Sequence, residues 1–495
     1  MKADYLKISF LVVGSIPSLN VMFAQNTPNI LLIVSEDNGC DLGCYGNTKV
    51  FTPNIDSLAS NGMRFMNAYV TYSVSSPSRS SIFTGLYPHQ NGQIGLATHK
   101  YRMYEGVKTL PQYLRELGYF SACIGKKHVN PEADISFDYW DNRSSNFEKK
   151  KLKSYAEKTV SFCKSLHGNP FFVMVNFPDA HFPLQREVEG LPHHLVDKSQ
   201  VAPLPYINVN SSRHKYFVES YYDCINRLDE SIGFLLQEMS KNKLLDNTII
   251  IYMSDHGEQF PRAKCSNYEA GLHIPFIISW PNHVKEGITN NALISTIDLL
   301  PTFIELAGGK IPANLPGKSL LPILKGKSEN LHSYIFAGGM GSAPIMHYPR
   351  RSVRDSRYKL IVNYNYMEDN PHYQLYVNQE GHFAGGLSME ELEMAPDSMK
   401  HVFQTWKRPP LYELYDLWVD PYEFHNLSDK EKYKSVLENL KTVLSEWQEI
   451  TNDPIRDPNK LRAINEEVKA ILRNEIDYTQ PDFKWGYLDY FIDKK

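Results

Sequence analysis

This chain of 495 residues has few cysteines and little net charge of either sign. Its six cysteines are scattered and form no C-x-x-C pair, so the sequence carries no zinc-site pattern and favours no particular disulfide pairing. A formal net charge of −4 leaves no basic excess of the kind that nucleic-acid binding requires. The sequence therefore predicts no nucleic-acid partner.

Long apolar runs are missing beyond the N-terminus. Two lysines precede the apolar residues 8–24, which Gly14 and Pro17 interrupt. This pattern is typical of an export signal, whereas a membrane span needs about 20 apolar residues. We therefore predict a signal peptide over residues 1–24 and no membrane span. The protein is expected to be exported, with the periplasm of a Gram-negative bacterium as its compartment.

Short apolar runs alternate with amphipathic segments over most of the chain. Buried strands are predicted at residues 29–34, 120–124, 171–177, 248–253 and 274–280. Helices are predicted at residues 53–63, 109–117, 151–166, 213–241 and 295–307. Because strands alternate with helices, we predict an α/β fold with a large, mainly parallel sheet flanked by helices.

The sequence pattern changes after about residue 345. Residues 357–365 and 411–417 predict antiparallel strands, and an apolar stripe at helical spacing follows over residues 436–447. We therefore predict a large α/β domain over residues 25–345. Residues 346–495 are expected to form a smaller C-terminal α+β domain built on an antiparallel sheet.

Two pairs of polar residues follow two of the predicted strands directly: Glu36 with Asp37, and Asp255 with His256. Ligands of parallel α/β sheets gather beyond the carboxyl ends of the strands. Carboxylates brought together there repel each other unless a cation lies between them, and oxygen ligands suit calcium. The imidazole leaves magnesium and manganese open. Capping of a turn explains either pair alone, but two pairs favour a metal site.

The stretch SVSSPSRSS, residues 73–81, is unusually rich in hydroxyl groups. Ser75 is placed to cap a predicted helix over residues 76–84 that has Pro77 in its first turn. The start of a helix is also a site where anions bind, because unpaired N–H groups point outward there. Arg79 adds a permanent cation.

The same stretch resembles the sulfatase signature, Cys or Ser-x-Pro-Ser-Arg-x4-Thr-Gly, with Ser75 in the first position. Other segments resemble sulfatases in family order over about residues 28–450: TPNIDSLASNG, TLPQYLRELGY, IGKKH, YMSDHGE, STIDLLPT and ELYDLWVDPYEFHNL. A narrower resemblance, to the N-sulfoglucosamine sulfohydrolases, is carried by HQNGQIGL, GKKHVNPE, PRRSVRDSRYKLIVNYNY and EWQEITNDP. This resemblance implies an alkaline phosphatase-like fold.

The resemblance also implies a chemistry. Ser75 would be oxidised to formylglycine by a serine-type formylglycine-generating enzyme. One hydroxyl of the hydrated aldehyde would attack sulfur, and the other would collapse to release sulfate. The implied metal site, most simply one Ca²⁺, comprises Glu36, Asp37, Ser75, Asp255 and His256. Glu36 stands where the family usually has Asp.

The resemblance assigns roles to further residues. Arg79 and Lys126 steady the diol, His128 takes the proton that releases sulfate, Lys264 contacts sulfate, His181 protonates the leaving oxygen or nitrogen, and Asp179 orients His181 or a substrate hydroxyl. Asp179, His181 and Lys264 are thus the expected substrate-binding residues. Lys264 departs from the sulfohydrolases compared with it, which carry Arg there.

The expected substrate is the N-sulfated glucosamine of heparin or heparan sulfate. Three alternatives stay open. The first is an O-sulfatase acting on another glycosaminoglycan or on glucosamine 6-sulfate. The second is a phosphonate or phosphate ester hydrolase of the same superfamily, and the third is a non-catalytic glycan-binding protein.

Overall fold

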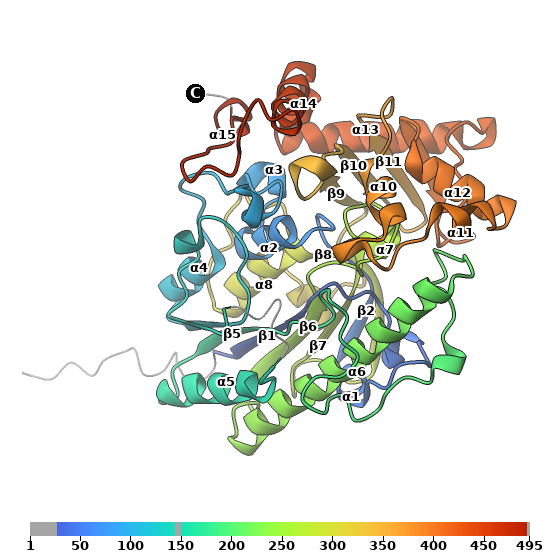
Figure 1. The fold of residues 1–495 in the computed structure, drawn as a ribbon. Helices are drawn as coiled ribbons and strands as arrows, with labels where there is room; N and C mark the ends of the chain where they lie inside the picture. The colour runs from blue at the N-terminus through green and yellow to red at the C-terminus, as the bar shows by residue number, and fades with distance from the viewer. Residues whose placement is uncertain (1–26, 144–149, 493–495) are drawn as a thin grey trace, which may run out of the picture.

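The structure is a computed structural model that describes residues 27–143 and 150–492. The predicted signal peptide, residues 1–24, lies outside the described residues. The described chain forms a large sheet covered by helices on both faces and a smaller sheet beside it (Figure 1). The α/β prediction, with a second antiparallel sheet near the C-terminus, is confirmed.

The large sheet has eight strands in the order β4-β3-β5-β1-β6-β7-β2-β8. Their bounds are β1 Asn29–Ser35, β2 Met63–Tyr69, β3 Phe120–Ile124, β4 Tyr139–Asp141, β5 Phe171–Asn176, β6 Thr248–Ser254, β7 His273–Ser279 and β8 Ile288–Ser295. Neighbouring strands are parallel except that β7 runs antiparallel to both β6 and β2. The carboxyl ends of the other strands therefore meet at one edge.

Side chains of the central strands are buried on both faces of this sheet because helices cover each face. Leu31 and Ile33 of β1 pack with one layer of helices: α1 Pro53–Ser60, α5 Lys153–Ser165 and α6 Ser212–Lys241. Ile30 and Leu32 face the other layer: α2 Ser75–Thr84, α4 Leu110–Glu116 and α8 Leu299–Leu306. The continuous apolar run of β1 follows from this double burial.

The small sheet is antiparallel, in the order β12-β11-β10-β9. Its strands are β9 Ile335–Gly339, β10 Arg350–Arg354, β11 Tyr358–Asn363 and β12 Tyr412–Asp416. Leu440 and Trp447 of α13 Lys434–Ile450 pack on this sheet, as the apolar stripe predicts. The remaining C-terminal helices are α10 Pro371–Asn378, α11 Met389–Glu393, α12 Asp397–Lys407, α14 Pro458–Leu472 and α15 Tyr487–Tyr490.

Two differences from the sequence-based prediction concern residues 53–69. The helix predicted over residues 53–63 ends at Ser60, and Met63 already begins strand β2. The prediction also carried no strand at 63–69, because only part of β2 is buried and its pattern lacks a clean alternation. This strand matters because its carboxyl end leads directly to α2 and Ser75.

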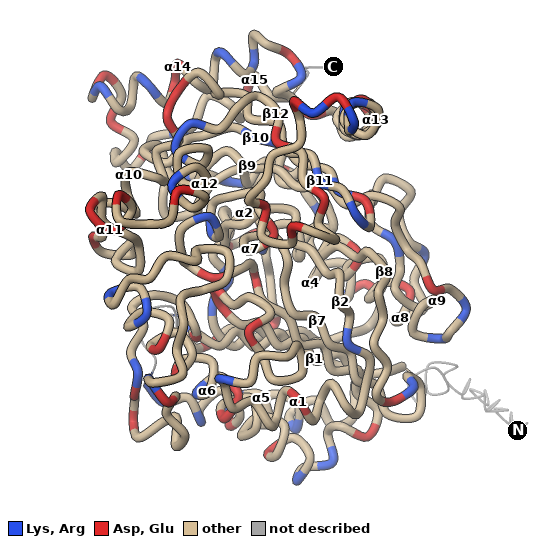
Figure 2. Tube along the Cα trace, turned by 90° about the vertical axis from the view of Figure 1, so that its right-hand side faces the viewer, with Lys and Arg blue, Asp and Glu red and all other residues tan. Residues whose placement is uncertain are grey.

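The structure also describes features that the sequence leaves open. All six cysteines are free thiols. Within residues 27–143 and 150–492, no helix combines the length and apolar character needed to cross a bilayer. Along the Cα trace, Lys and Arg residues are interspersed with Asp and Glu residues (Figure 2).

Candidate active site

The candidate site lies at the edge where the parallel strands end. Each of five strands, β1, β2, β3, β5 and β6, delivers polar residues to this edge, as the strand-end rule predicts. In chain order, these residues are Glu36 and Asp37 after β1, Ser75 after β2, Lys126 and His128 after β3, Asp179 and His181 after β5, and Asp255 and His256 after β6.

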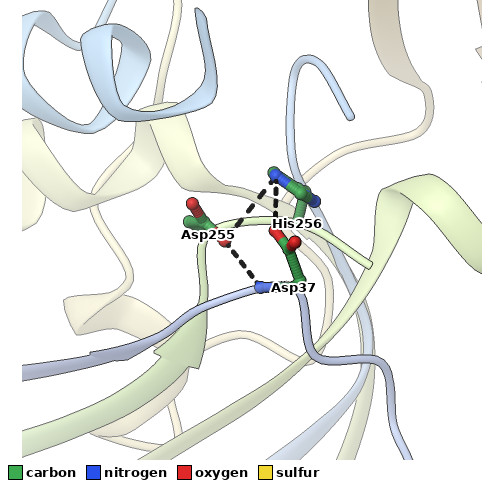
Figure 3. Close-up of side chains that lie close together, drawn as sticks. All are labelled: Asp37, Asp255 and His256. Carbon is green, nitrogen blue, oxygen red and sulfur yellow. Dashed lines mark hydrogen bonds and ion pairs between the residues drawn. The ribbon is translucent and has the colours of Figure 1, made fainter. Parts of the chain in front are cut away.

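Three of these residues form a compact cluster (Figure 3). The ligand atoms of Asp37, Asp255 and His256 all lie within 4.8 Å of one another, and the three side chains are completely buried. His256 Nε2 lies 3.2 Å from Asp37 Oδ1 and 3.8 Å from Asp255 Oδ1. Two carboxylates and one imidazole that converge in this way fit a divalent metal ion.

Charges around the cluster keep its members in the form that binds metal. Burial alone would raise the pKa of Asp37, but Lys264 and His256 lower that pKa to about 2. Against the same effect of burial, His256 and Arg79 hold the pKa of Asp255 well below its ordinary value. Burial lowers the pKa of His256, which favours a neutral imidazole. Metal ligands must be deprotonated, so the cluster is prepared for a cation.

Glu36 lies beside this cluster and is held by two cations. Its Oε1 accepts a hydrogen bond from Arg79, and its Oε2 lies 2.7 Å from Lys126 Nζ. Arg79 also contacts Asp255 Oδ2 at 3.2 Å and Asn176 Oδ1 at 2.6 Å. Glu36 therefore positions the guanidinium and the ammonium next to the cluster.

Ser75 does not cap α2 as predicted, because the helix begins at Ser75 itself and Val74 occupies the cap position. The first turn is closed by a hydrogen bond from Ser78 N to Val74 O. The Ser75 side chain is thereby free to face the cluster, and its Oγ lies 3.1 Å from His256 Nε2. A buried hydroxyl group thus stands directly beside the candidate metal ligands.

His128, His181 and Lys264 line one cavity of about 230 Å³. Lys264 Nζ lies 2.7 Å from Asp37 Oδ2, which joins the cavity to the cluster. His181 Nδ1 contacts Phe182 O at 2.7 Å, so Nδ1 carries the proton that it donates to this carbonyl. Burial holds the pKa values of His128 and His181 well below the ordinary range.

Asp179 lies beneath the site and does not line the cavity. Its two carboxylate oxygens accept hydrogen bonds from Arg227 of α6, at 2.8 and 2.9 Å, and both side chains are buried. The backbone around it pairs with the loop after β1, because Glu36 N donates to Asp179 O. This arrangement makes Asp179 an anchor of the site.

Several residues around the site carry no signal in their local sequence. Asn176, which binds Arg79, is the one polar residue of strand β5, and only that contrast marks it. The other walls of the cavity come from distant loops and from α10: Leu96, Thr98, His99, Gln259, Cys265, Ser342, Met346, Tyr376, His382 and Phe383. No motif links these segments, so their assembly is visible only in the structure.

Five cationic or titratable groups lie around the metal-type cluster and its neighbouring buried hydroxyl: Arg79, Lys126, His128, His181 and Lys264. This arrangement suits hydrolysis of an anionic ester or amide. The chain belongs to the sulfatase family, whose model matches residues 28–309. It is therefore a sulfuric ester or sulfamate hydrolase. Within this family it resembles the N-sulfoglucosamine sulfohydrolases, because a model described as "N-sulphoglucosamine sulphohydrolase, C-terminal" matches residues 257–382.

Individual relatives agree with the assignment to the sulfatase family. An ulvan-active sulfatase of Formosa agariphila is 32% identical over 86% of this chain and 81% of its own length. The human N-sulphoglucosamine sulphohydrolase is 30% identical over 86% of this chain and 91% of its own. A protein solved in complex with its substrate D-glucosamine-2-N,6-O-disulfate has the same fold, with a TM-score of 0.65 at 21% identity over 86% of this chain and 98% of that one.

Proposed function

We propose that this sulfatase hydrolyses the sulfamate of N-sulfated glucosamine units of heparin or heparan sulfate. The supporting observation is where the two family matches fall. Residues 257–382, which resemble the C-terminal part of the N-sulphoglucosamine sulphohydrolases, include Gln259, Lys264, Tyr376 and His382, which line the catalytic cavity. The resemblance therefore concerns the walls that contact a sugar as well as the chemistry-bearing edge.

Asp37, Asp255 and His256 would hold one divalent metal ion, which we propose to be Ca²⁺. Ser75 is next to them, and Glu36 supports the site through Arg79 and Lys126. When bound, such an ion polarises a sulfuryl oxygen and the attacking oxygen. Formylglycine made from Ser75 by a serine-type formylglycine-generating enzyme supplies that oxygen as a hydrated aldehyde.

The remaining residues bind charge and move protons. Arg79, Lys126 and Lys264 place positive charge around the sulfuryl oxygens, where negative charge develops. Because Nδ1 of His181 donates to Phe182 O, its Nε2 is the nitrogen that would take up a proton and pass it to the leaving nitrogen. Nδ1 of His128 is buried and has no hydrogen-bond partner among the described residues, so it can accept the proton that frees sulfate.

The N-terminal sequence bears on where the reaction takes place. The N-terminal residues 1–24 have the pattern of an export signal. We therefore place the mature enzyme outside the cytoplasm, in the periplasm, acting on sulfated glycan delivered there.

A second candidate substrate is an O-sulfated sugar. The ulvan-active relative at 32% identity favours it, and so does Lys264, because a point charge does not reproduce the bidentate contact of the Arg that the sulfohydrolases carry. The rest of the mechanism is unchanged by this choice.

A panel of sulfated sugars tests the proposal. Calcium-loaded enzyme would be given monosaccharides and heparin disaccharides sulfated at N or at the 2-, 3- or 6-oxygen, and sulfate release would be measured. Intact mass of the Ser75 peptide, which falls by two hydrogens on oxidation, confirms that the enzyme is in its active form. We expect the N-sulfated sugars to be turned over. Turnover of an O-sulfated sugar with none of the N-sulfated one would disprove the sulfamidase assignment.

A further inference from the structure

A second cavity, of about 740 Å³, lies between the large and the small sheet. It is lined by Tyr69 at the end of β2, by His273 of β7 and by Arg354 of β10, and its mouth is lined by Trp418 and Tyr422. None of the residues assigned to the reaction lines it. The role of this cavity therefore requires a separate explanation.

This cavity and the catalytic cavity share one wall, the loop over residues 257–265. Glu258 and Arg262 of the loop line the second cavity, whereas Gln259 and Lys264 line the catalytic one. The loop is closed by a hydrogen bond from Lys264 N to Glu258 O at 3.1 Å. The two cavities are thus neighbours with different linings.

The second cavity is lined by more carboxyl groups than guanidinium groups. Four carboxylates line it, against two guanidinium groups: Asp41, Glu258, Glu269 and Glu423, against Arg262 and Arg354. Glu269 and Glu423 form ion pairs with Arg354 and Lys359. Asp41 and Glu258 form no ion pair with any basic side chain of the described chain.

Four buried polar atoms on this lining have no hydrogen bond of normal geometry among the described residues: Tyr206 Oη, Glu258 Oε2, Glu423 Oε1 and Arg262 Nε. Glu258 is 4% exposed, and its Oε2 has no hydrogen bond of normal geometry among the described residues. The hydroxyl of Tyr206, which is 7% exposed, interacts with this carboxyl group, whose pKa is raised to about 8 by burial and by the neighbouring Asp41. Asp41 accepts only from the neutral Tyr221 hydroxyl at 3.2 Å and from Asn47 at 3.4 Å. Buried oxygens in this state are costly, and a ligand with positively charged N–H donors would satisfy them.

The mouth of the cavity presents aromatic rings to solvent. Trp418 is 68% exposed and Tyr422 is 41% exposed. The Trp418 ring is held in place, since its Nε1 donates to Ser356 O at 3.0 Å and the Arg357 guanidinium lies 5.0 Å from its centroid. A fixed, exposed ring of this kind offers an apolar surface with a polar edge, which suits the face of a pyranose.

We propose that this cavity binds a saccharide that carries a free amino group. The ammonium group lies against Asp41 and Glu258, and a sugar ring packs on Trp418. The carboxyl groups of Asp41 and Glu258 disfavour a sulfate group beside them, so this site differs in specificity from the catalytic cavity. The desulfated product of the proposed reaction is one source of such a ligand, and any other glucosamine-containing glycan is another. The inference holds whichever sulfated sugar is the substrate.

Calorimetric titration of the full, calcium-loaded protein with a glucosamine trisaccharide tests this site. The N-acetylated trisaccharide serves as the uncharged comparison and should bind at least about tenfold more weakly, as expected when a charged contact is lost. Trp418→Ala and Asp41→Asn should each weaken binding of the glucosamine trisaccharide by roughly tenfold. Tyr216→Ala, which removes a ring that is 54% exposed and lies outside the cavity, should not.

Further variants separate this site from the catalytic one. Lys264→Ala alters only the catalytic cavity and should leave trisaccharide binding unchanged. Trp418→Ala should keep full turnover of an aryl sulfate, which also shows that it folds. The proposal is overturned by equal affinity for the two trisaccharides, by absence of binding, or by loss of binding in Lys264→Ala but not in Trp418→Ala. Calcium binding that Asp41→Asn removes, without any saccharide binding, would also overturn it.

Discussion

At the scale of single residues, the adjacent carboxylates Glu36 and Asp37 have opposite environments. Asp37 faces Lys264 and His256, and its pKa falls to about 2. Glu36 is held by Arg79 and Lys126, yet burial outweighs these cations and its pKa is raised. One carboxylate is therefore a firm anion beside the cluster, and the other organises the cations. The side chain of Glu36 is one methylene longer than that of the usual Asp, and we associate this extra length with its contacts to Arg79 and Lys126.

Ser75→Ala should abolish multiple-turnover sulfate release while the fold is kept. The Ser75 side chain has one short contact, to His256, and losing a single hydrogen bond costs about 1 kcal/mol. Sulfate release and a thermal melt would be compared with those of Ser81→Ala, a buried serine on the same helix that bonds Thr71. Substantial turnover by Ser75→Ala would show that this hydroxyl is not the nucleophile precursor.

His181→Ala should reduce hydrolysis of a sulfated sugar far more than hydrolysis of nitrophenyl sulfate. A sugar nitrogen or oxygen is a poor leaving group and needs a proton, whereas an aryl oxide leaves without one. The kcat/KM of wild type and variant would be measured on both substrates. Equal losses on the two would mean that His181 positions the substrate and donates no proton.

Removal of the divalent metal should lower both activity and stability. A cation bound to Asp37, Asp255 and His256 stabilises the native state, by about 2.7 kcal/mol when it is present at a hundred times its Kd. Chelator-treated protein, checked by elemental analysis, would be assayed and melted before and after calcium is restored. Full activity in metal-free protein would contradict the metal assignment.

At the scale of elements, the site depends on how neighbouring strand ends are tied together. The loops after β1 and β5 exchange backbone hydrogen bonds, Glu36 N to Asp179 O at 2.9 Å and Ala180 N to Glu36 O at 2.6 Å. The Asp179–Arg227 pair then fastens this junction to helix α6. Helix α6 thereby helps to hold the junction between the loops that carry Glu36 and His181.

Arg227→Met should destabilise the protein by about 3–5 kcal/mol, because it leaves the buried Asp179 carboxylate without its cation. The double variant Asp179→Leu/Arg227→Met removes both charges and should be less damaged than the single one. Urea unfolding would be compared with that of Arg408→Met, which breaks an exposed ion pair to Asp369 and should cost about 1 kcal/mol or less. A small effect of Arg227→Met would contradict the anchoring role.

At the scale of the whole molecule, the catalytic cavity is completed by a segment inserted in the small sheet. Helices α10, α11 and α12 lie between β11 and β12 in the chain, and this insertion carries Tyr376 and His382 to the cavity. His214 of α6 holds the insertion through a hydrogen bond between its Nδ1 and Gly385 O at 3.0 Å. The two sheets and their helices therefore build one site.

His214 should make this junction sensitive to acid. Burial lowers the pKa of His214 from 6.5 to about 4, so in the unfolded chain this histidine takes up its proton at higher pH than in the native state. Its contribution to stability is therefore constant above pH 6.5 and falls towards pH 4, by at most about 1.4 kcal/mol per pH unit.

The measurement is the difference in unfolding free energy between wild type and His214→Gln, taken from about pH 7 down to about pH 4. Subtracting the variant removes the contributions of other titrating groups. We expect the advantage of the wild type to shrink as the pH falls. A difference that stays constant over this interval would show that His214 does not titrate in this way.

The sequence by itself determined the α/β class, most central strands and the polar residues that gather where the parallel strands end. The reason is local: a buried parallel strand needs a continuous apolar run, and the polar residues that follow it must lie at the shared edge. Glu36, Asp37, Lys126, Asp255 and His256 follow such runs directly, so their proximity could be predicted. The family resemblance added Ser75 and the roles of the histidines.

Only the tertiary structure decided which of these residues touch. Asp37 joins His256 while Glu36 turns to Arg79, Asp179 pairs with Arg227, and Ser75 leaves the cap position to face the cluster. The tertiary structure alone also decided the antiparallel direction of β7 and the contribution of residues 342–383 to the cavity walls. Each depends on contacts between segments far apart in the chain, whose geometry and burial no local pattern of residues encodes.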